Sequence, residues 1–430
     1  MVILFVAAAL AALALIVGLH RYAYVRLVRD TTSGPGPVRR LGAAVFVAGP
    51  LLMVGAVASE RAGAPFWLQR TLSWPGFLWM PLGLYLVLAL LAGELVRPLL
   101  RRALERRAAR QGENEGPAPS EDTVTAEPAA EPAGETVAAE AVAAEGVADE
   151  AAARPEPSRR LFVSRVVGGT AAAVAVGTVG YGTYGVLRGP RVKRVTVPLA
   201  KLPRSAHGFR IAVVSDIHLG PVLGRGFAQK VVDTINSTQP DLIAVVGDLV
   251  DGSVKNLGPA AAPLAGLRAR HGSYFVTGNH EYFSGAAQWV RQVRELGIHP
   301  LENARTELAG FDLAGVNDLQ GESEGQGPDF GKALGDRDRT RACVLLAHQP
   351  VQIHEAVRHG VDLQLSGHTH GGQLWPGNFV AAAANPTVAG LERYGDTQLY
   401  VSRGAGAWGP PTRVGAPSDI TVVELASPEA

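Results

Sequence analysis

The sequence predicts a mixed α/β domain preceded by an all-α region that spans a membrane. Long uncharged apolar stretches lie in the first 190 of the 430 residues. From about Arg210 onward, short β-branched runs alternate with amphipathic segments. Such alternation is typical of sheets covered by helices. We therefore expect transmembrane helices first and a globular domain over 195–425, joined by a short tether at 189–197.

Four apolar stretches are each close to the length of about 20 helical residues that crosses a bilayer. They cover 1–19, 41–59, 71–93 and 166–187, and arginine flanks each of them. This repetition favours membrane spans over buried core helices. For the first stretch a cleaved signal peptide is the alternative, but no basic segment precedes its apolar run. We expect three transmembrane helices in 1–110 and a fourth in 158–190.

The distribution of arginine predicts which loops face the cytoplasm. Arginines gather after the first and third apolar stretches, whereas the loop between the second and third contains only Arg61 and Arg70. The fourth helix then carries the chain outward, so we expect the domain outside the cytoplasm. Basic residues directly after that helix favour the opposite orientation: Arg188, Arg191, Lys193 and Arg194.

The motif SRRLFV at 158–163 directly precedes the fourth apolar stretch. It resembles the twin-arginine export signal, an address that a receptor reads. This export route carries proteins that are already folded with their cofactors, so the export machinery is an expected partner. An ordinary basic flank of a membrane helix is the alternative.

The segment 111–157 separates the third and fourth stretches and consists mostly of Ala, Glu, Pro and Gly. It contains twelve acidic residues against one basic residue, Arg154, and no aromatic residue. Such a segment cannot bury enough apolar surface to offset the entropy that ordering costs. We expect a disordered linker without a chemical role.

Polar side chains follow five of the predicted strands at the point where each strand ends. They stand in the motifs SDIHLG, GDLVDG, GNHEY, AHQP and SGHTHGG. Ligands gather beyond the carboxyl ends of strands in open α/β sheets, so we expect one shared site. The candidate residues are Asp216, His218, Asp248, Asp251, Asn279, His280, Glu281, His348, His368 and His370.

The mixture of carboxylate, imidazole and amide groups predicts a metal site. Such ligands suit Mn, Zn, Fe or Co, whereas cages of oxygen atoms suit Mg or Ca. An extended His-x-His points both rings to one side, so His368 and His370 are expected to reach two adjacent cations. The single cysteine, Cys343, excludes an intrachain disulfide and a multi-cysteine zinc site.

The motifs DIH, GDLVD, GNHE, AHQP and GHTH resemble those of the calcineurin-like metallophosphoesterases. They are most similar to a membrane-associated bacterial branch that includes relatives of UDP-diacylglucosamine pyrophosphohydrolase. The resemblance covers about 195–425 and implies a four-layer α/β/β/α sandwich with a two-metal centre.

The resemblance also implies a role for each candidate residue. Asp216, His218 and His370 would hold the first metal, and Asn279, His348 and His368 the second, with Asp248 bridging both. His280 would face the substrate without ligating and would stabilise the phosphoryl group or protonate the leaving oxygen, and Asp251 would lie outside the ligand set, next to the ligands. Glu281 stands where many relatives have Asp, and its carboxylate would support His280.

These residues predict a metal-dependent phosphoric ester hydrolase. Two cations about 3.5–4 Å apart clamp an in-line displacement and lower the pKa of a shared water from roughly 15.7 toward about 7. We therefore expect metal-activated hydroxide to hydrolyse a phosphodiester or pyrophosphate bond, in an envelope or lipid-linked substrate. Trp375 and Trp408 would line a slot for a lipid, touch the membrane, or simply pack loops onto the domain.

Two other functions stay open. One is a phosphomonoesterase, including one that acts on phosphoproteins. The other is a non-catalytic envelope assembly protein with a structural metal site, against which the unligated His280 argues. A nucleic-acid substrate is not expected, because the net charge is only +1 and no basic, aromatic-interleaved surface is evident.

Overall fold

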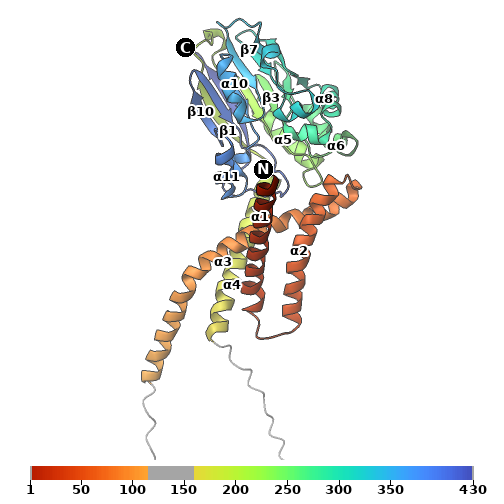
Figure 1. The fold of residues 1–430 in the computed structure, drawn as a ribbon. Coiled ribbons are helices and arrows are strands. Elements are labelled where there is room, and N and C mark those ends of the chain that lie inside the picture. Colours follow the sequence, from red (N-terminus) through yellow and green to blue (C-terminus); the bar gives the residue numbers. More distant parts are fainter. Residues whose placement is uncertain (1, 115–158, 429–430) are drawn as a thin grey trace, which may run out of the picture.

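The computed structural model describes residues 2–114 and 159–428. Four long helices stand below a domain of two sheets and shorter helices (Figure 1). These long helices are α1 (Val2–Tyr24), α2 (Pro37–Arg61), α3 (Phe66–Asn114) and α4 (Arg159–Leu187). Four helical segments are long and apolar enough to cross a membrane, namely Leu10–Arg29, Pro37–Arg61, Phe66–Arg107 and Arg159–Leu187, and the first of them continues past α1.

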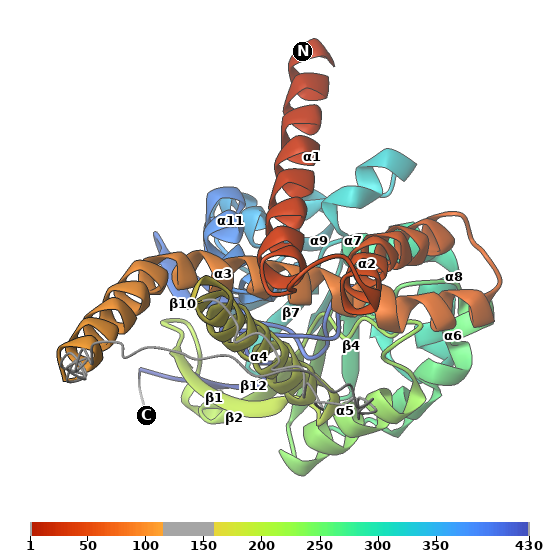
Figure 2. The ribbon, with the colours of Figure 1, turned by 90° about the horizontal axis from the view of Figure 1, so that it is seen from below.

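The third helix is longer than the predicted span at 71–93. It is one helix of 49 residues that contains Pro75, Pro81 and Pro98, and it bends as it passes beneath the domain (Figure 2). The extension is rich in Leu, Ala, Arg and Glu, which are strong helix formers. The predicted linker over 111–157 begins inside this helix, and residues 115–158 lie outside the described residues.

The domain contains two six-stranded sheets. The first has the order β1-β12-β2-β3-β4-β5, and the second has the order β10-β11-β9-β8-β7-β6. The strands of the first sheet are β1 (Arg191–Pro198), β2 (Phe209–Val214), β3 (Leu242–Val246), β4 (Ser273–Val276), β5 (His299–Pro300) and β12 (Asp419–Ala426). Those of the second are β6 (Ala304–Glu307), β7 (Phe311–Gly315), β8 (Ala342–Leu346), β9 (Leu363–Ser366), β10 (Gly390–Tyr394) and β11 (Thr397–Val401).

Helices cover the outer face of each sheet, which confirms the predicted four-layer sandwich. Against the first sheet lie α5 (Arg225–Ser237), α6 (Val254–Ala261) and α8 (Ala286–Glu295), and against the second lie α9 (Phe330–Leu334) and α10 (Ile353–Arg358). Two further helices, α7 (Asn279–Ser284) and α11 (Gly377–Ala384), follow site-bearing loops. One hydrophobic core lies between each sheet and its helices. A third hydrophobic core lies between the two sheets and contains residues of both.

Strand β3 illustrates why the sequence forms this core. All five of its residues are buried, and neighbouring side chains point to opposite faces of a strand. Ile243 and Val245 contact the core beneath the helices. Leu242, Ala244 and Val246 contact the core between the sheets. A strand covered on both faces therefore has no polar position.

The predicted tether at 189–197 is wrong. Residues Arg191–Pro198 form β1, which pairs in parallel with β12 over its whole length. The two N-terminal positions of β1 are exposed, and its side chains alternate between exposed and partly buried positions. Basic residues at an exposed edge strand discourage pairing with other chains. In the sequence these basic residues look like the charged end of the preceding apolar helix, which is why the strand was not predicted.

The long helices pack directly on the domain. Tyr85 of α3 donates a hydrogen bond from Oη to the carbonyl of Trp375 at 2.9 Å. Thr183 of α4 and Thr412 pair through their hydroxyls at 2.7 Å. A Cβ at Gly182 would lie 2.7 Å from the carbonyl oxygen of Arg413. The domain is therefore seated on α3 and α4 through close polar and apolar contacts.

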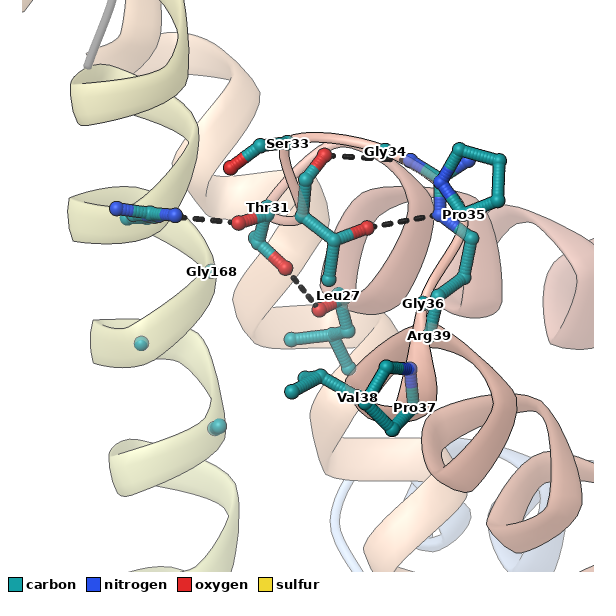
Figure 3. A pocket seen from close by; sticks show the side chains of 14 residues that line it. Leu27, Thr31, Ser33, Gly34, Pro35, Gly36, Pro37, Val38, Arg39 and Gly168 are labelled. Carbon is teal, nitrogen blue, oxygen red and sulfur yellow. Dashed lines mark hydrogen bonds between the residues drawn. The ribbon is translucent and has the colours of Figure 1, made fainter. Parts of the chain in front are cut away.

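The loop between α1 and α2 lies at the end of the helices away from the domain (Figure 1). Arginine side chains close it, as Figure 3 shows. Arg165 of α4 donates from Nε to the carbonyl of Thr31 at 3.0 Å, and Arg39 donates from Nε to Thr32 Oγ1 at 2.8 Å. The cavity beside this loop has a volume of about 640 Å³. Hydrogen bonds donated by these two arginines therefore fix the loop between α1 and α2.

Candidate metal centre

Loops from both sheets bring the candidate side chains together. They follow β2, β3 and β4 of the first sheet and β8 and β9 of the second. The carboxyl ends of these strands meet at one end of the sandwich, as expected from the motif order. These segments contain, in that order, Asp216 and His218; Asp248 and Asp251; Asn279 and His280, which are the first two residues of α7; His348; and His368 and His370.

Five of these residues have a left-handed backbone. Asp216, His218, Asp248, His368 and His370 have φ angles of 52°, 48°, 52°, 71° and 52°. Positive φ is uncommon for residues other than glycine and gathers at functional sites, where the surrounding fold maintains the strain.

This geometry corrects the expectation of an extended His-x-His. The residue between the two histidines, Thr369, is in the right-handed helical region. The two rings point into different groups, because His370 faces His218 and His368 faces Asn279.

Asp216, His218 and His370 form the first group of candidate ligands. One ligand atom from each lies within 4.8 Å of the others. The Nε2 atoms of His218 and His370 face each other at 3.0 Å, and Asp216 Oδ1 lies 3.3 Å from His370 Nε2. All three side chains are buried.

Asp248, His348 and His368 form the second group, again with ligand atoms within 4.8 Å of one another. Asp248 Oδ2 lies 3.1 Å from His348 Nε2. The side chain of Asn279 belongs to the same cluster, because its Oδ1 lies 3.1 Å from His368 Nδ1. This group therefore offers a carboxylate, two imidazoles and an amide oxygen.

Asp248 lies between the two groups. Its Oδ2 is 3.1 Å from His348 Nε2 in the second group and 3.7 Å from His218 Nε2 in the first. Its Oδ1 accepts a hydrogen bond from the backbone N–H of His280 at 2.9 Å. One carboxylate thus contacts both groups.

Asp251 holds two imidazoles through one oxygen. Its Oδ1 lies 2.6 Å from His280 Nδ1 and 2.9 Å from His218 Nδ1. Burial works to lower the pKa of His280, but the hydrogen bond to Asp251 outweighs burial and raises that pKa to about 9. Burial works to raise the pKa of Asp251, but the charge of His218 holds it well below its usual value. The pair of His280 and Asp251 is therefore ionised at neutral pH.

The pKa values of His348, His368 and His370 are shifted in different directions. Burial would lower the pKa of His348, but the charge of Asp248 raises it well above its usual value. Burial lowers the pKa of His368 to about 4, and the charge of His348 adds to this effect. Burial, with the charge of Arg413, holds the pKa of His370 well below its usual value. His368 and His370 are thus neutral at pH 7, the form that binds a metal.

The donor set fits divalent cations. His348 Nε2 is buried and makes no well-aligned hydrogen bond with the described residues, although Asp248 Oδ2 is 3.1 Å away. Buried charged groups are normally paired or coordinate metals, and three buried or half-buried aspartates converge here. Mixed nitrogen and oxygen donors suit transition metals.

Comparison with known proteins identifies the family. A model of the calcineurin-like phosphoesterase family matches residues 209–372. An uncharacterised metallophosphoesterase of Aquifex aeolicus is 35% identical over 240 residues, which are 55% of this chain and 91% of that protein. The chain belongs to the calcineurin-like phosphoesterase family. The family assignment agrees with the motifs, which predicted a metal-dependent phosphoric ester hydrolase.

Two further relatives extend the comparison. A metallophosphoesterase of Bacillus subtilis is 30% identical over 284 residues, 63% of this chain and 98% of that protein. A transmembrane protein with metallophosphoesterase domain of Danio rerio is 39% identical over 259 residues, 57% of this chain and 59% of that protein. This phosphoesterase therefore spans less than two thirds of the length of the fish relative. Members of the family bind divalent metals, which agrees with the candidate ligand groups.

Glu281 acts mainly on the backbone and reaches His280 only through its charge, which is among those that raise the pKa of that ring. Its carboxylate does not contact His280; it accepts hydrogen bonds from the backbone N–H groups of Asp248, Leu249 and Gly278 at 2.9, 2.8 and 2.6 Å. Glu281 is the third residue of α7, so its side chain turns back over the helix start. Burial raises its pKa to about 7. Its contribution is to fix the backbone that presents Asp248.

Sequence reasoning missed Arg413. This buried guanidinium donates to the carbonyls of Gly406, His370 and Ala416 at 2.6, 3.0 and 3.1 Å. Its Nη2 also lies 2.9 Å from His370 Nδ1. A guanidinium can only donate hydrogen bonds, so Nδ1 of the neutral His370 ring is the acceptor and the proton of that ring is on Nε2. A cation bound to Nε2 would leave the proton on Nδ1 instead, and the contact between Arg413 and Nδ1 would then have to open. No local motif marks Arg413, since it lies 43 residues from His370.

Sequence reasoning also missed Asp318. It follows β7 and accepts two hydrogen bonds from Gln349 Nε2 at 2.9 and 3.0 Å, next to His348. Burial raises its pKa. The rule that selected the other residues, that site residues follow strand ends, would have found Asp318 if it had been applied to the strand Phe311–Gly315.

Proposed function

We propose that this protein is a membrane-anchored two-metal phosphoesterase that hydrolyses a phosphodiester or pyrophosphate bond. The observation that carries the proposal is the position of Asp248 between two groups of candidate ligands. Its Oδ2 contacts an imidazole of each group, at 3.1 and 3.7 Å. One shared carboxylate between two ligand groups is what a binuclear site requires.

In this proposal each group holds one cation, with Mn, Zn, Fe or Co as the candidate ions. The first group is Asp216, His218 and His370; the second is Asn279, His348 and His368; Asp248 belongs to both. Bound cations would polarise the phosphoryl oxygens and lower the pKa of an attacking water.

His280 is the proposed proton donor for the reaction. Asp251 binds its Nδ1, so the proton for the leaving oxygen would come from Nε2. Attack of water on phosphorus breaks the bond to the leaving oxygen, which takes that proton. The raised pKa of His280, about 9, keeps the ring protonated at neutral pH before the transfer.

The substrate class we propose is an envelope or lipid-linked phosphoester. Helix α11 lies at the end of the domain nearest to the long helices (Figure 1) and has no buried residue. Its Phe379 and Val380 are 66% and 74% exposed, and the nearby Trp375 is 50% exposed. Exposed apolar and tryptophan side chains at this level are typical of segments that touch a membrane interface.

The same argument extends to localisation. We propose a multi-pass protein whose domain faces outside the cytoplasm, delivered by the twin-arginine machinery that would read Arg159 and Arg160. The α1–α2 loop, with Arg26 and Arg29, and the C-terminal part of α3, with six arginines within 97–110, lie at the end of the helices away from the domain (Figure 1). Such arginine-rich ends face the cytoplasm.

Two substitutions test the reaction proposed. The His280→Ala variant should keep its bound metal, but its turnover rate should fall about 10²–10⁴-fold, because general acid catalysis contributes a factor of that size. Asp248→Asn should lose both metal and turnover, because both groups share this carboxylate. Metal analysis and hydrolysis of bis-p-nitrophenyl phosphate by the full chain in detergent measure the two effects.

His354→Ala is the matched control, because His354 is an exposed imidazole on α10 outside the site. Unchanged rates in both site variants would contradict the assignment. Metal binding without any hydrolysis by the native chain would favour an assembly protein. Preference for p-nitrophenyl phosphate over the diester would favour a phosphomonoesterase.

A further inference from the structure

A cavity beside His280 is shared between the domain and the long helices. Its volume is about 380 Å³. The domain contributes His218, Asp251 and His280 to its wall. The end of α2 and the first part of α3 close the other side with Glu60, Arg61 and Phe77. The cavity beside His280 is therefore lined in part by helices that precede the domain.

The turn between α2 and α3 is positioned for this contribution. Figure 1 shows it rising from the helices to the domain beside α6, and Figure 2 shows α3 crossing beneath the domain from that turn. Phe66, the first residue of α3, packs against the core beneath the helices of the first sheet. This contact fixes the turn on the domain surface.

Aromatic side chains flank His280 in this cavity. The ring centroids of Phe283 and Trp408 lie 5.4 and 5.7 Å from that of His280. Both are exposed, by 65% and 55%, whereas Phe77 of α3 is only 7% exposed. The proton donor therefore lies within an apolar rim that both parts of the chain supply.

Arg61 is the one lysine or arginine among the described residues that line the cavity. It is exposed, and its side chain makes no hydrogen bond or ion pair with any residue in the described part of the chain. Its neighbour Glu60 instead accepts a hydrogen bond from Ser73 Oγ at 3.4 Å. Within the described part of the chain the Arg61 guanidinium interacts with the charge of Glu60 but uses none of its hydrogen-bond donors, so these can bind an anion.

We propose that Arg61 and Phe77 are substrate-binding residues, through which the membrane hairpin α2–α3 selects amphipathic phosphoesters. Arg61 binds the anionic group next to the reacting phosphoryl group, and a guanidinium suits phosphate oxygens because it offers paired donors. Phe77, with Phe283 and Trp408, binds the apolar part that adjoins it. This inference rests on the proposed function and adds the recognition of an amphiphile to it.

A competition experiment with the full chain in detergent tests the inference. Hydrolysis of bis-p-nitrophenyl phosphate reports the reaction, and farnesyl pyrophosphate is the competing probe, with Mn in excess of all phosphate. The native chain should be inhibited by farnesyl pyrophosphate at least 10-fold more strongly than by inorganic pyrophosphate. Arg61→Ala should raise the half-inhibitory concentration of farnesyl pyrophosphate about 10-fold, and Arg61→Lys should raise it less.

The matched control is Arg70→Ala, which removes an exposed arginine of the same hairpin outside the cavity and should change nothing. Phe77→Leu, which keeps an apolar side chain, should weaken inhibition by farnesyl pyrophosphate but not by inorganic pyrophosphate. Equal inhibition of the native chain and Arg61→Ala, or equal potency of the two probes, would overturn the inference. If the metal-loaded native chain fails to hydrolyse the diester, the proposed function fails instead.

Discussion

At the residue scale, Asp251 sets the charge of the site from a third cluster, in which ligand atoms of His218, Asp251 and His280 also lie within 4.8 Å of one another. It holds His280 and His218 by their Nδ1 atoms. The pKa of His280 is about 9 against an ordinary value of 6.5. The raised pKa of His280 stabilises the folded state; this contribution to the free energy of unfolding is complete below pH 6.5 and is lost as the pH rises through about 9. The depressed pKa of Asp251 gives stabilisation that is present above its ordinary value of 3.8 and lost at lower pH.

Asp251→Asn should therefore shift the alkaline limb of the pH–rate profile downward by about 1–2 pH units. Without the carboxylate, the ring of His280 loses its proton at lower pH and can no longer donate it. Rates measured between pH 6 and 10 at saturating metal provide the test. Asp233→Asn, which changes an exposed carboxylate of α5, should leave the profile unchanged, and an unshifted limb in Asp251→Asn would contradict this role.

The candidate site residues were predictable because each follows a strand, and strand ends can be located from β-branched runs. Their backbone conformations were not, since the left-handed φ of His368 and His370 depends on contacts with other loops. Arg413 and the true partner of Glu281 were missed for the same reason. Both act through hydrogen bonds to backbone groups, which no side-chain pattern in the sequence reveals.

At the element scale, the loop before α7 is packed too tightly against Asp248 to admit a side chain. A Cβ at Gly278 would collide with the Asp248 carboxylate and would also lie 2.6 Å from its backbone nitrogen. The φ of Gly278 is −103°, which any residue adopts. The requirement for glycine here is therefore steric and not conformational.

Gly278→Ala should lower the free energy of unfolding by about 1–3 kcal/mol, the usual cost of overpacking, and should reduce bound metal. Thermal unfolding and metal analysis of the detergent-solubilised chain measure both effects. The control is Gly226→Ala in α5, where no atom lies within 4 Å of the added Cβ. A stable Gly278→Ala variant with full metal content would show that the loop can relax.

Most strands and helices of the domain were predictable from periodicity, including the hairpin of β6 and β7. Three of the unpredicted elements share a physical cause. Strand β1 is an exposed edge with basic residues, β5 has only two residues, and α11 has no buried residue. Each lacks the apolar period that makes an element visible in a sequence, and each exists through tertiary contacts.

At the scale of the whole molecule, the proposed orientation of the domain outside the cytoplasm rests on where the arginines lie. We expect alkaline phosphatase fused to the C-terminus to be active and a cytoplasmic reporter fused there to be silent. Replacement of Arg159 and Arg160 by lysine should keep the charge but abolish export, because the receptor reads arginine. Reporter activity in cells carrying each fusion provides the measurement, and export that survives the lysine pair would contradict the twin-arginine route.

The seating of the domain on α3 and α4 has a consequence for kinetics. Only three residues, 188–190, separate α4 from β1, and Tyr85 and Thr183 tie the helices to the loops below the site. The end of the domain that contains the site is therefore held next to the long helices. For a lipid substrate, encounters would occur by lateral diffusion within one leaflet, and turnover would follow the mole fraction of that lipid in the bilayer rather than its total concentration.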